Sequence, residues 1–244
     1  MQYGKPNIQP LGEQAILLTW DAIIDENLLY FLLEIKQKIE NNYTKVKVEV
    51  INTYNSLLVN YSFAINNAYN EILQLKQLIS TPIDYKLNSF FQFTLPVCYS
   101  PKFGLDLALL SEQNQLSISE IIELHTQPNY TIYFTGFLPG FLYLGGLHKK
   151  LYISRKKTPR LQVQKGTVAI GEKQTGIYPQ NSPGGWHIIG KTPVSLFNIK
   201  NEPSCEILPS DEISFKPISK LEFENIKIEQ EKGIYELKKW AHND

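Results

Sequence analysis

The hexapeptide SPGGWH, which begins at Ser182, holds the residues of this sequence best suited to chemistry. Its paired glycines, Gly184 and Gly185, let backbone N–H groups approach an anion or a carbonyl closely, and Ser182 adds a hydroxyl. Trp186 provides an apolar wall, and the imidazole of His187 is a candidate proton carrier. The alternative is that Trp186 and His187 alternate along a strand, one inward and one outward, without a catalytic role.

Three further polar residues precede this hexapeptide. Arg160 follows Pro159, and its planar guanidinium suits a carboxylate or a phosphate; the alternative is a structural salt bridge. Gln174 and Tyr178 offer an amide and a hydroxyl to a small polar ligand, or they satisfy the backbone of a turn. We predict His187 and Arg160 as catalytic, and Gln174 and Tyr178 as residues that bind substrate or nucleotide together with Ser182, Gly184 and Gly185.

A second glycine- and proline-rich segment, FLPGF, runs from Phe137 to Phe141. Pro139 and Gly140 at its centre are predicted to border the same binding site, as a pocket wall or a partner surface. The alternative is a hydrophobic corner that stabilises the surrounding fold.

The common catalytic signatures are missing from the sequence: it contains no HExxH, Walker A, GxSxG or GxGxxG motif. The four histidines show no metal-ligand spacing, so no metal site is predicted. His125 closes a predicted helix, where a cation favours the helix dipole. Cys98 and Cys205 lie far apart and form no CxxC pair, which is typical of reduced thiols.

The charge balance and the hydropathy of the sequence argue against two kinds of partner, nucleic acids and membranes. The 24 basic and 24 acidic residues cancel, and no basic patch with interleaved aromatic residues occurs, which argues against nucleic acid. The longest basic run, Arg155–Lys157, is short and is interpreted as a solvated loop. No run of about 18 apolar residues and no signal-peptide pattern is present, so we expect a soluble cytoplasmic protein without a membrane.

The first 88 residues have the pattern of a small α+β domain. Apolar residues recur at helical spacing in two segments and at strand spacing in three. The expected strands are 15–20, 46–50 and 56–61, and the expected helices are 26–40 and 67–79. The resulting order, β-α-β-β-α, predicts a ferredoxin-like domain with the helices on one face of a sheet.

Residues 89–222 have the pattern of a second domain built from short strands cut by glycine and proline, which predicts a closed or nearly closed β-barrel. Two short helices are expected in it, over 104–110 and 117–126. The second has a capping box of Ser117 and Glu120. The expected strands are 91–95, 130–134, 161–163, 167–170, 186–189, 194–197 and 213–215.

Two stretches flank the second domain. The linker before it is predicted at Thr81–Pro82 and over Lys86–Ser89. Residues 223–244 form a charged C-terminal tail, with a short helix predicted over 235–240.

In order along the chain, the motifs TGFLPGFLYLGGL, TPR, GTVAIG and QTGIYPQNSPGGWHIIGKTP resemble one bacterial family. It includes the B subunit of the ATP-dependent 5-oxoprolinase and is also labelled allophanate hydrolase subunit 1 and KipI-like histidine kinase inhibitor. The resemblance begins near Leu11 and runs to Phe215. It implies a cyclophilin-like barrel for the second domain. Departures from the family pattern fall at Ser100–Lys102, Phe141–Tyr143 and Ile153–Arg155.

This resemblance implies an enzyme component that is inactive alone. The implied reaction is the ATP-dependent opening of 5-oxoproline to glutamate, with ATP and Mg²⁺ shared with partner subunits. The implied partners are the homologous, carboxyltransferase-like C subunit, docked as a heterodimer, and the unrelated A subunit. In this reaction Arg160 would anchor an anion, and the Gly184–Gly185 turn would donate to a developing oxyanion.

Two other functions fit the same resemblance. A non-catalytic inhibitor of a sensor histidine kinase would use an exposed apolar surface. A carboxyltransferase half-domain of a urea carboxylase or allophanate hydrolase system would need a partner that carries biotin.

Overall fold

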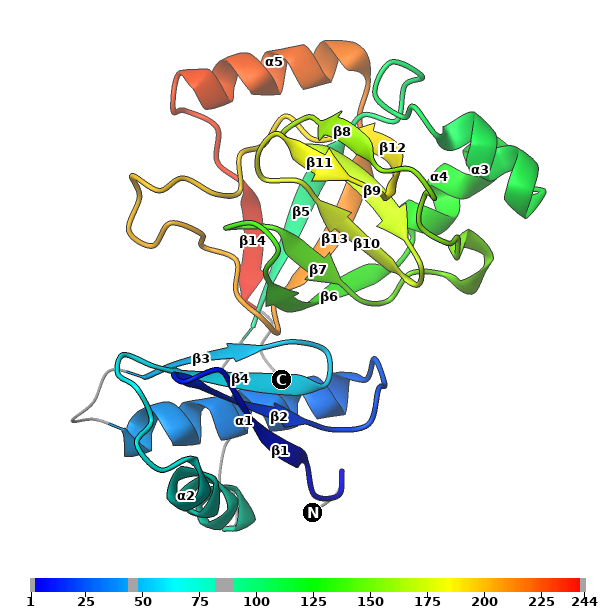
Figure 1. Ribbon diagram of the computed structural model, residues 1–244. Helices are drawn as coiled ribbons and strands as arrows, with labels where there is room; N and C mark the ends of the chain where they lie inside the picture. The colour runs from blue at the N-terminus through cyan, green and yellow to red at the C-terminus, as the bar shows by residue number, and fades with distance from the viewer. Residues whose placement is uncertain (1–2, 44–47, 82–89, 242–244) are drawn as a thin grey trace. The chain divides into compact units, whose positions relative to one another are not determined.

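The computed structural model describes residues 3–43, 48–81 and 90–241. Two compact units make up the chain, Met1–Asn88 and Ser89–Asp244 (Figure 1). The predicted linker falls almost entirely outside the described residues.

The first unit is a four-stranded antiparallel sheet with two helices. Its strands lie in the order β1-β2-β4-β3, so β4 separates β2 from β3. The elements are β1 (Asn7–Leu11), β2 (Ala15–Thr19), α1 (Glu26–Asn42), β3 (Val48–Asn52), β4 (Ser56–Tyr61) and α2 (Ala68–Ser80). The two predicted helices and the predicted strands 15–20 and 56–61 are confirmed, as is the described part of the predicted strand 46–50, of which residues 46 and 47 lie outside the described residues. The ferredoxin-like arrangement itself stays a prediction.

Local signals explain why these helices form. The Asp25 side chain caps α1 by accepting a hydrogen bond from the Leu28 amide, and Asn67 caps α2 in the same way. The buried residues of α1 recur at three- and four-residue spacing and pack against strand residues such as Val50 and Val59 in one core. Strand β1 escaped prediction because most of its side chains are exposed and it contains Pro10, so it lacks the alternating pattern.

The second unit contains an eight-stranded sheet in the order β12-β9-β10-β7-β6-β13-β5-β14. Strands β5 and β13 pair in parallel and run side by side through the unit (Figure 1). The strands are β5 (Phe91–Val97), β6 (Asn129–Thr135), β7 (Leu142–Leu144), β9 (Thr167–Gly171), β10 (Gln174–Ile177), β12 (His187–Lys191), β13 (Glu212–Pro217) and β14 (Lys238–Ala241). A separate two-stranded ribbon pairs β8 (Arg160–Val163) with β11 (Ser182–Gly184).

The prediction was a closed or nearly closed β-barrel, and the described strands form no closed barrel, because the pairing runs from β12 to β14 without joining these two strands. An isolated bridge between Cys98 and Lys191 joins the end of β5 to β12, with reciprocal backbone hydrogen bonds of 2.9 and 3.1 Å. The chain is therefore a mixed α+β protein with several sheets. The cyclophilin-like arrangement stays a prediction.

Two helices and a 3₁₀ turn precede the ribbon: α3 (Leu107–Asn114), α4 (Ile118–Thr126) and η1 (Lys149–Leu151). The capping box of Ser117 and Glu120 is confirmed at the start of α4.

His125 is fully buried, and burial lowers its pKa to about 3, so the predicted charge–dipole role is wrong. Instead its two ring nitrogens hydrogen-bond the hydroxyls of Tyr99 and Thr175, at 2.8 and 3.0 Å.

Tertiary packing decides the remaining elements. Helix α3 begins three residues later than predicted, after Gly104, which packs so tightly that an added Cβ would lie 2.6 Å from the Ile189 carbonyl oxygen. Residues 194–197 form no strand, although one was predicted there.

The C-terminal stretch folds as helix α5 (Lys220–Glu231) followed by strand β14. The predicted helix over 235–240 is wrong, because β14 pairs there with the otherwise open edge of β5.

Candidate functional site

A small cavity of about 250 Å³ lies in the second unit, where the two glycine-rich segments meet. We call it the aromatic pocket. Its volume suits a ligand of a few heavy atoms around one ring. Its lining residues are Phe137, Phe141, Tyr143, Arg155, Pro159, Tyr178, Pro183, Gly184, Gly185 and Trp186.

Edge-to-face packing holds the rings of this pocket in place. Phe141 sits at the centre: its ring lies 5.6 Å from that of Trp186 and 5.1 Å from that of Tyr178, at interplanar angles of 84° and 87°. Tyr143 packs against both Phe141 and Trp186. Aromatic pairs prefer this geometry, so the walls are preformed rather than collapsed. Phe137 is exposed and lies at the rim.

The two adjacent glycines of the pocket differ in how tightly they are packed. An added Cβ at Gly184 would lie 2.4 Å from the Tyr178 hydroxyl, so this position needs glycine for packing. An added Cβ at Gly185 would meet nothing closer than the Pro159 ring at 3.7 Å. Gly185 therefore leaves open space beside its backbone, which is where a ligand can approach.

Arg155 supplies the positive charge of the aromatic pocket. Its guanidinium carbon lies 5.7 Å from the centre of the Trp186 ring, a cation–π contact. Its backbone amide donates to the Glu172 carboxylate at 3.2 Å. Among the ion pairs within the described residues, none engages its guanidinium, so the fork is open to a planar anion.

The role of Arg155 was missed from the sequence, because the basic run was interpreted as a solvated loop. One signal was available. Arg155 and Arg160 are the two arginines of the sequence, they lie five positions apart, and lysines supply the other basic charges.

Tyr178 contributes a hydroxyl group to the pocket. Burial raises the pKa of Tyr178, and the Trp186 amide donates a hydrogen bond to its oxygen, which partly offsets that rise. The phenol is therefore protonated at neutral pH, and its own proton is available to a ligand carbonyl.

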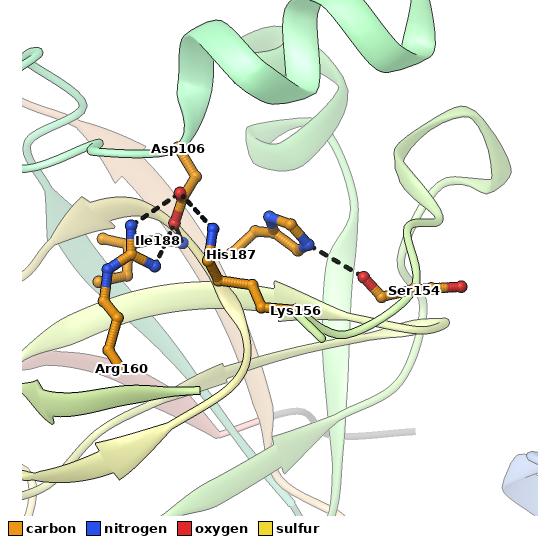
Figure 2. A network of polar contacts seen from close by, with 6 residues as sticks. All are labelled: Asp106, Ser154, Lys156, Arg160, His187 and Ile188. Carbon is orange, nitrogen blue, oxygen red and sulfur yellow. Dashed lines mark hydrogen bonds and ion pairs between the residues drawn. The ribbon is translucent and has the colours of Figure 1, made fainter. Parts of the chain in front are cut away.

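A buried carboxylate beside the pocket gathers three donor groups, and Figure 2 shows their arrangement. Asp106 accepts hydrogen bonds from Nη1 and Nη2 of Arg160, both at 2.8 Å. Lys156 Nζ and the Ile188 amide donate to it at 3.1 and 2.7 Å. We call these four residues the Asp106 network.

The Asp106 network accounts for Arg160 structurally. Burial pushes the pKa of the Asp106 carboxyl up, but the hydrogen bonds from Arg160, Ile188 and Lys156 outweigh burial and hold the pKa below its usual value. Both terminal nitrogens of Arg160 are committed to this carboxylate. The geometry therefore supports the salt-bridge interpretation of Arg160 and offers no open guanidinium there.

His187 also lies outside the aromatic pocket. Its Nε2 donates to the Ser154 carbonyl oxygen at 2.9 Å, and the ring is buried (Figure 2). Nδ1 is buried and has no hydrogen-bond partner among the described residues. Trp186 lines the pocket while His187 does not, but both side chains are buried and β12 begins at His187, so the expected alternation of one inward and one outward residue along a strand is not observed.

The other predicted site residues divide into two groups. Tyr178, Gly184 and Gly185 line the aromatic pocket, whereas four do not: Gln174, Ser182, Pro139 and Gly140. The Ser182 hydroxyl donates to the Pro183 carbonyl, and Gly140 packs against the Phe197 ring.

The described residues contain no cluster of three or more His, Cys, Asp or Glu side chains able to hold a metal ion. Nor is any helix within them both long enough and apolar enough to span a bilayer.

Comparison with known proteins identifies one family over most of the chain. Residues 6–207 match the model of the family described as "Carboxyltransferase domain, subdomain C and D". The B subunit of 5-oxoprolinase from Bacillus subtilis is 34% identical over 238 residues, which cover 91% of this chain and 97% of that protein. The protein of the same name in Haemophilus influenzae is 35% identical over 215 residues, which cover 86% of this chain and 96% of that protein.

A similar fold occurs within a larger enzyme. The crystal structure of Kluyveromyces lactis urea carboxylase superposes with a TM-score of 0.83 at 18% identity. The match covers 97% of this chain and 24% of that one. At this identity the likeness shows a shared carboxyltransferase-type fold.

Proposed function

This chain belongs to the family of 5-oxoprolinase B subunits, and on that premise we propose that it is part of an ATP-dependent 5-oxoprolinase that opens the lactam of 5-oxoproline to glutamate. Its proposed partners are the homologous C subunit, docked as a heterodimer, and the A subunit. The 34–35% identity over nearly the full length of two proteins of this name supports the assignment.

The aromatic pocket suits 5-oxoproline in three ways. The substrate carries a carboxylate, which matches the open guanidinium of Arg155. Its small ring matches the walls formed by Phe141 and Trp186. Its lactam oxygen is a hydrogen-bond acceptor, which matches the protonated hydroxyl of Tyr178. The observation that carries this proposal is the open arginine lying over Trp186 beside that hydroxyl.

Lactam opening needs activation because an amide is a poor electrophile. In the proposed sequence the γ-phosphoryl group of ATP passes to the lactam oxygen and ADP leaves. Water then adds to the activated carbon and the C–N bond breaks, with the nitrogen taking a proton. Hydrolysis of the acyl phosphate by a second water yields glutamate and inorganic phosphate. The residues of this chain would hold the carboxylate and the lactam oxygen, and exclude bulk water from the ring.

We propose that ATP and Mg²⁺ are held jointly by this chain and its partner subunits. Asp106, the buried carboxylate beside the pocket, already accepts from two cations and one amide, so it is a poor metal ligand. No step of the proposed reaction therefore depends on a metal held by Asp106.

The test is co-expression with the A and C subunits, purification through a tag on this chain, and an assay of 5-oxoproline-dependent ATP hydrolysis. Arg155→Ala should raise KM for 5-oxoproline by about 10- to 100-fold, the value of one charge-assisted hydrogen-bonded pair. Arg155→Lys should recover part of the loss. Lys157→Ala, in the same loop but outside the pocket, is the matched control.

Two outcomes would count against these assignments. Unchanged kinetics in Arg155→Ala would contradict the assignment of the pocket to 5-oxoproline. Absence of both partners and activity from the purified material would contradict the proposed role in a 5-oxoprolinase complex.

A second candidate, a carboxyltransferase half-domain, is favoured by the description of the matched family model and by the urea carboxylase fold. The same purified complex distinguishes the two. Carboxyl transfer from biotin would be abolished by avidin, whereas ATP-dependent lactam hydrolysis would not.

A further inference from the structure

A second cavity of the same unit, about 420 Å³ in volume, shares no residue with the aromatic pocket. Four lysines line it, and each comes from a different segment: Lys102 from the turn before α3, Lys165 from the β8–β9 turn, Lys191 from the end of β12, and Lys227 from α5. Helix α5 is drawn in orange at the top of Figure 1. We call this the lysine cavity.

The charge of the lysine cavity is strongly positive although the chain as a whole is neutral. Glu224 is the acidic residue of its lining, so four positive charges against one negative leave a formal excess of three. Among the ion pairs of the described residues, none joins Glu224 to these lysines; Lys227 pairs weakly with Glu231, at 3.9 Å on an exposed helix face. The cations therefore remain available to an external anion.

Two of the four lysines pack against an aromatic ring. The Nζ atoms of Lys102 and Lys191 lie 5.6 and 5.9 Å from the centre of the Phe103 ring, and this ring lies 4.5 Å from that of Phe223 at an interplanar angle of 33°. Lys191 also donates to the Gln164 side chain at 2.7 Å. An ammonium has three donors, so Lys191 keeps two for a ligand.

The backbone beneath the lysines is equally constrained. Gly166, which follows Lys165, has a φ of +80°, and a Cβ there would lie 2.4 Å from the Thr192 carbonyl oxygen. The Thr192 amide donates to the Gly166 carbonyl at 2.8 Å. These contacts fix the spacing between Lys165 and Lys191, because each lysine is the chain neighbour of one of the two contacting residues.

Like charges in this cavity repel one another. Burial is the main cause of a lowered pKa at Lys191, and Lys227 and Lys102 lower it further, while Glu224 raises it. An anion bound among these side chains would relieve that repulsion, so the repulsion between the lysines favours anion binding.

From the convergence of four lysines on one cavity we propose that this cavity binds a polyphosphate group, either a free polyphosphate or the triphosphate of a nucleotide, the second of which rests on the proposed use of ATP. Lysine binds phosphate as a point charge, whereas a carboxylate is better matched by the fork of an arginine, which this cavity lacks. A cavity of 420 Å³ exceeds what one phosphate needs and is adequate for a chain of two or three.

The experiment is isothermal titration calorimetry on the isolated full-length chain. It uses sodium tripolyphosphate, Mg²⁺-free ATP, adenosine and citrate as probes. Tripolyphosphate and ATP should bind with one site each, and adenosine and citrate should bind at least tenfold more weakly. Raising NaCl from about 50 to about 300 mM should weaken polyphosphate binding several-fold. If ATP binds more tightly than tripolyphosphate, the ligand is a nucleotide; equal affinity indicates a free polyphosphate.

Variants test the location of the site. Lys191→Met and Lys102→Ala should each weaken tripolyphosphate binding by about tenfold, with thermal midpoints close to that of the wild type. The control Lys220→Ala, which lies on α5 outside the lining, should bind tripolyphosphate as the wild type does.

Three results would overturn the proposal: an equal loss in Lys220→Ala, citrate binding as tight as that of tripolyphosphate, or no binding at low salt. Because neither a partner nor 5-oxoproline is present in these titrations, such a failure leaves the proposed lactam hydrolysis standing.

Discussion

The Asp106 network and the lysine cavity both bring cationic side chains together from separate segments of the second unit, but only in the network does a carboxylate of the site pair directly with the cations. Asp106 accepts from two cations and a backbone amide, and its side chain is 5% exposed. The lysine cavity sets four ammonium groups against one glutamate, with which none of them forms an ion pair in the described part of the chain. A cation with a buried partner is part of the scaffold, whereas cations without one are free to bind a ligand.

Arg155 and Arg160 show the same contrast five positions apart, one in a loop and one at the start of β8. Arg160 is held by Asp106, and Arg155 lies open over Trp186. Residue type alone therefore does not identify the binding arginine; the position of the nearest carboxylate does.

The largest expected effect comes from breaking the Asp106 network. Asp106→Asn should lower the free energy of unfolding by about 3 kcal/mol, because it leaves Arg160 and Lys156 without a counter-charge. Urea denaturation measures this. Asp211→Asn is the control, since Asp211 is equally buried but accepts from two backbone amides, of Phe91 and Leu208. Equal losses of unfolding free energy in both variants would show that Arg160 and Lys156 contribute nothing to the stabilisation by Asp106.

A second substitution tests the packing of the aromatic pocket. Gly184→Ala should cost about 1–3 kcal/mol of stability, because its methyl group collides with the Tyr178 hydroxyl. Gly185→Ala, which meets nothing closer than 3.7 Å, should leave the thermal midpoint almost unchanged. Calorimetric melting compares the two. If Gly185→Ala were the more damaging, the assignment of open space to Gly185 would be wrong.

The two buried aspartates should respond to pH in opposite directions. The pKa of Asp106 is lowered on folding, so its stabilisation is present above the ordinary value of 3.8 and is lost as pH falls through the folded pKa. Burial raises the pKa of Asp211, against hydrogen bonds from Phe91 and Leu208, so its contribution is present below 3.8 and lost as pH rises through the folded pKa. Denaturation of the wild type and both Asn variants between about pH 3 and 6 separates these slopes. If the free energy of unfolding of the two Asn variants changed with pH in the same way, the opposite pKa shifts of Asp106 and Asp211 would be refuted.

The smallest expected effect lies in the lysine cavity. Lys227→Gln should raise the pKa of Lys191, because it removes a nearby like charge. Nitrogen-detected NMR of the lysine side chains measures the change, and Lys220→Gln is the control on the same helix. A pKa of Lys191 that stays the same, or falls, would mean that the four lysines do not act together.

Local signals determined much of the fold. Apolar periodicity located α1 and α2 to within a few residues, and the capping box of Ser117 helped to locate α4. These signals act over one or two helical turns, so they can be recognised without knowing the rest of the chain. The glycine-rich motifs likewise indicated the family and part of the aromatic pocket.

Interactions between distant residues decided the rest. Asp106 lies 54 positions from Arg160, and nothing near either residue in the sequence indicates that they form a pair. Strand β14 exists because β5 offers an edge, and the lysine cavity exists because four separate segments meet.

The sequence by itself determined α1, α2 and α4, most strands, the family and part of the aromatic pocket, because each depends on neighbours along the chain. Only the tertiary structure decided which arginine is open, where His187 points and which lysines converge. Those properties depend on the nearest opposite charge or hydrogen-bond partner in space, and distance along the chain carries no information about that partner.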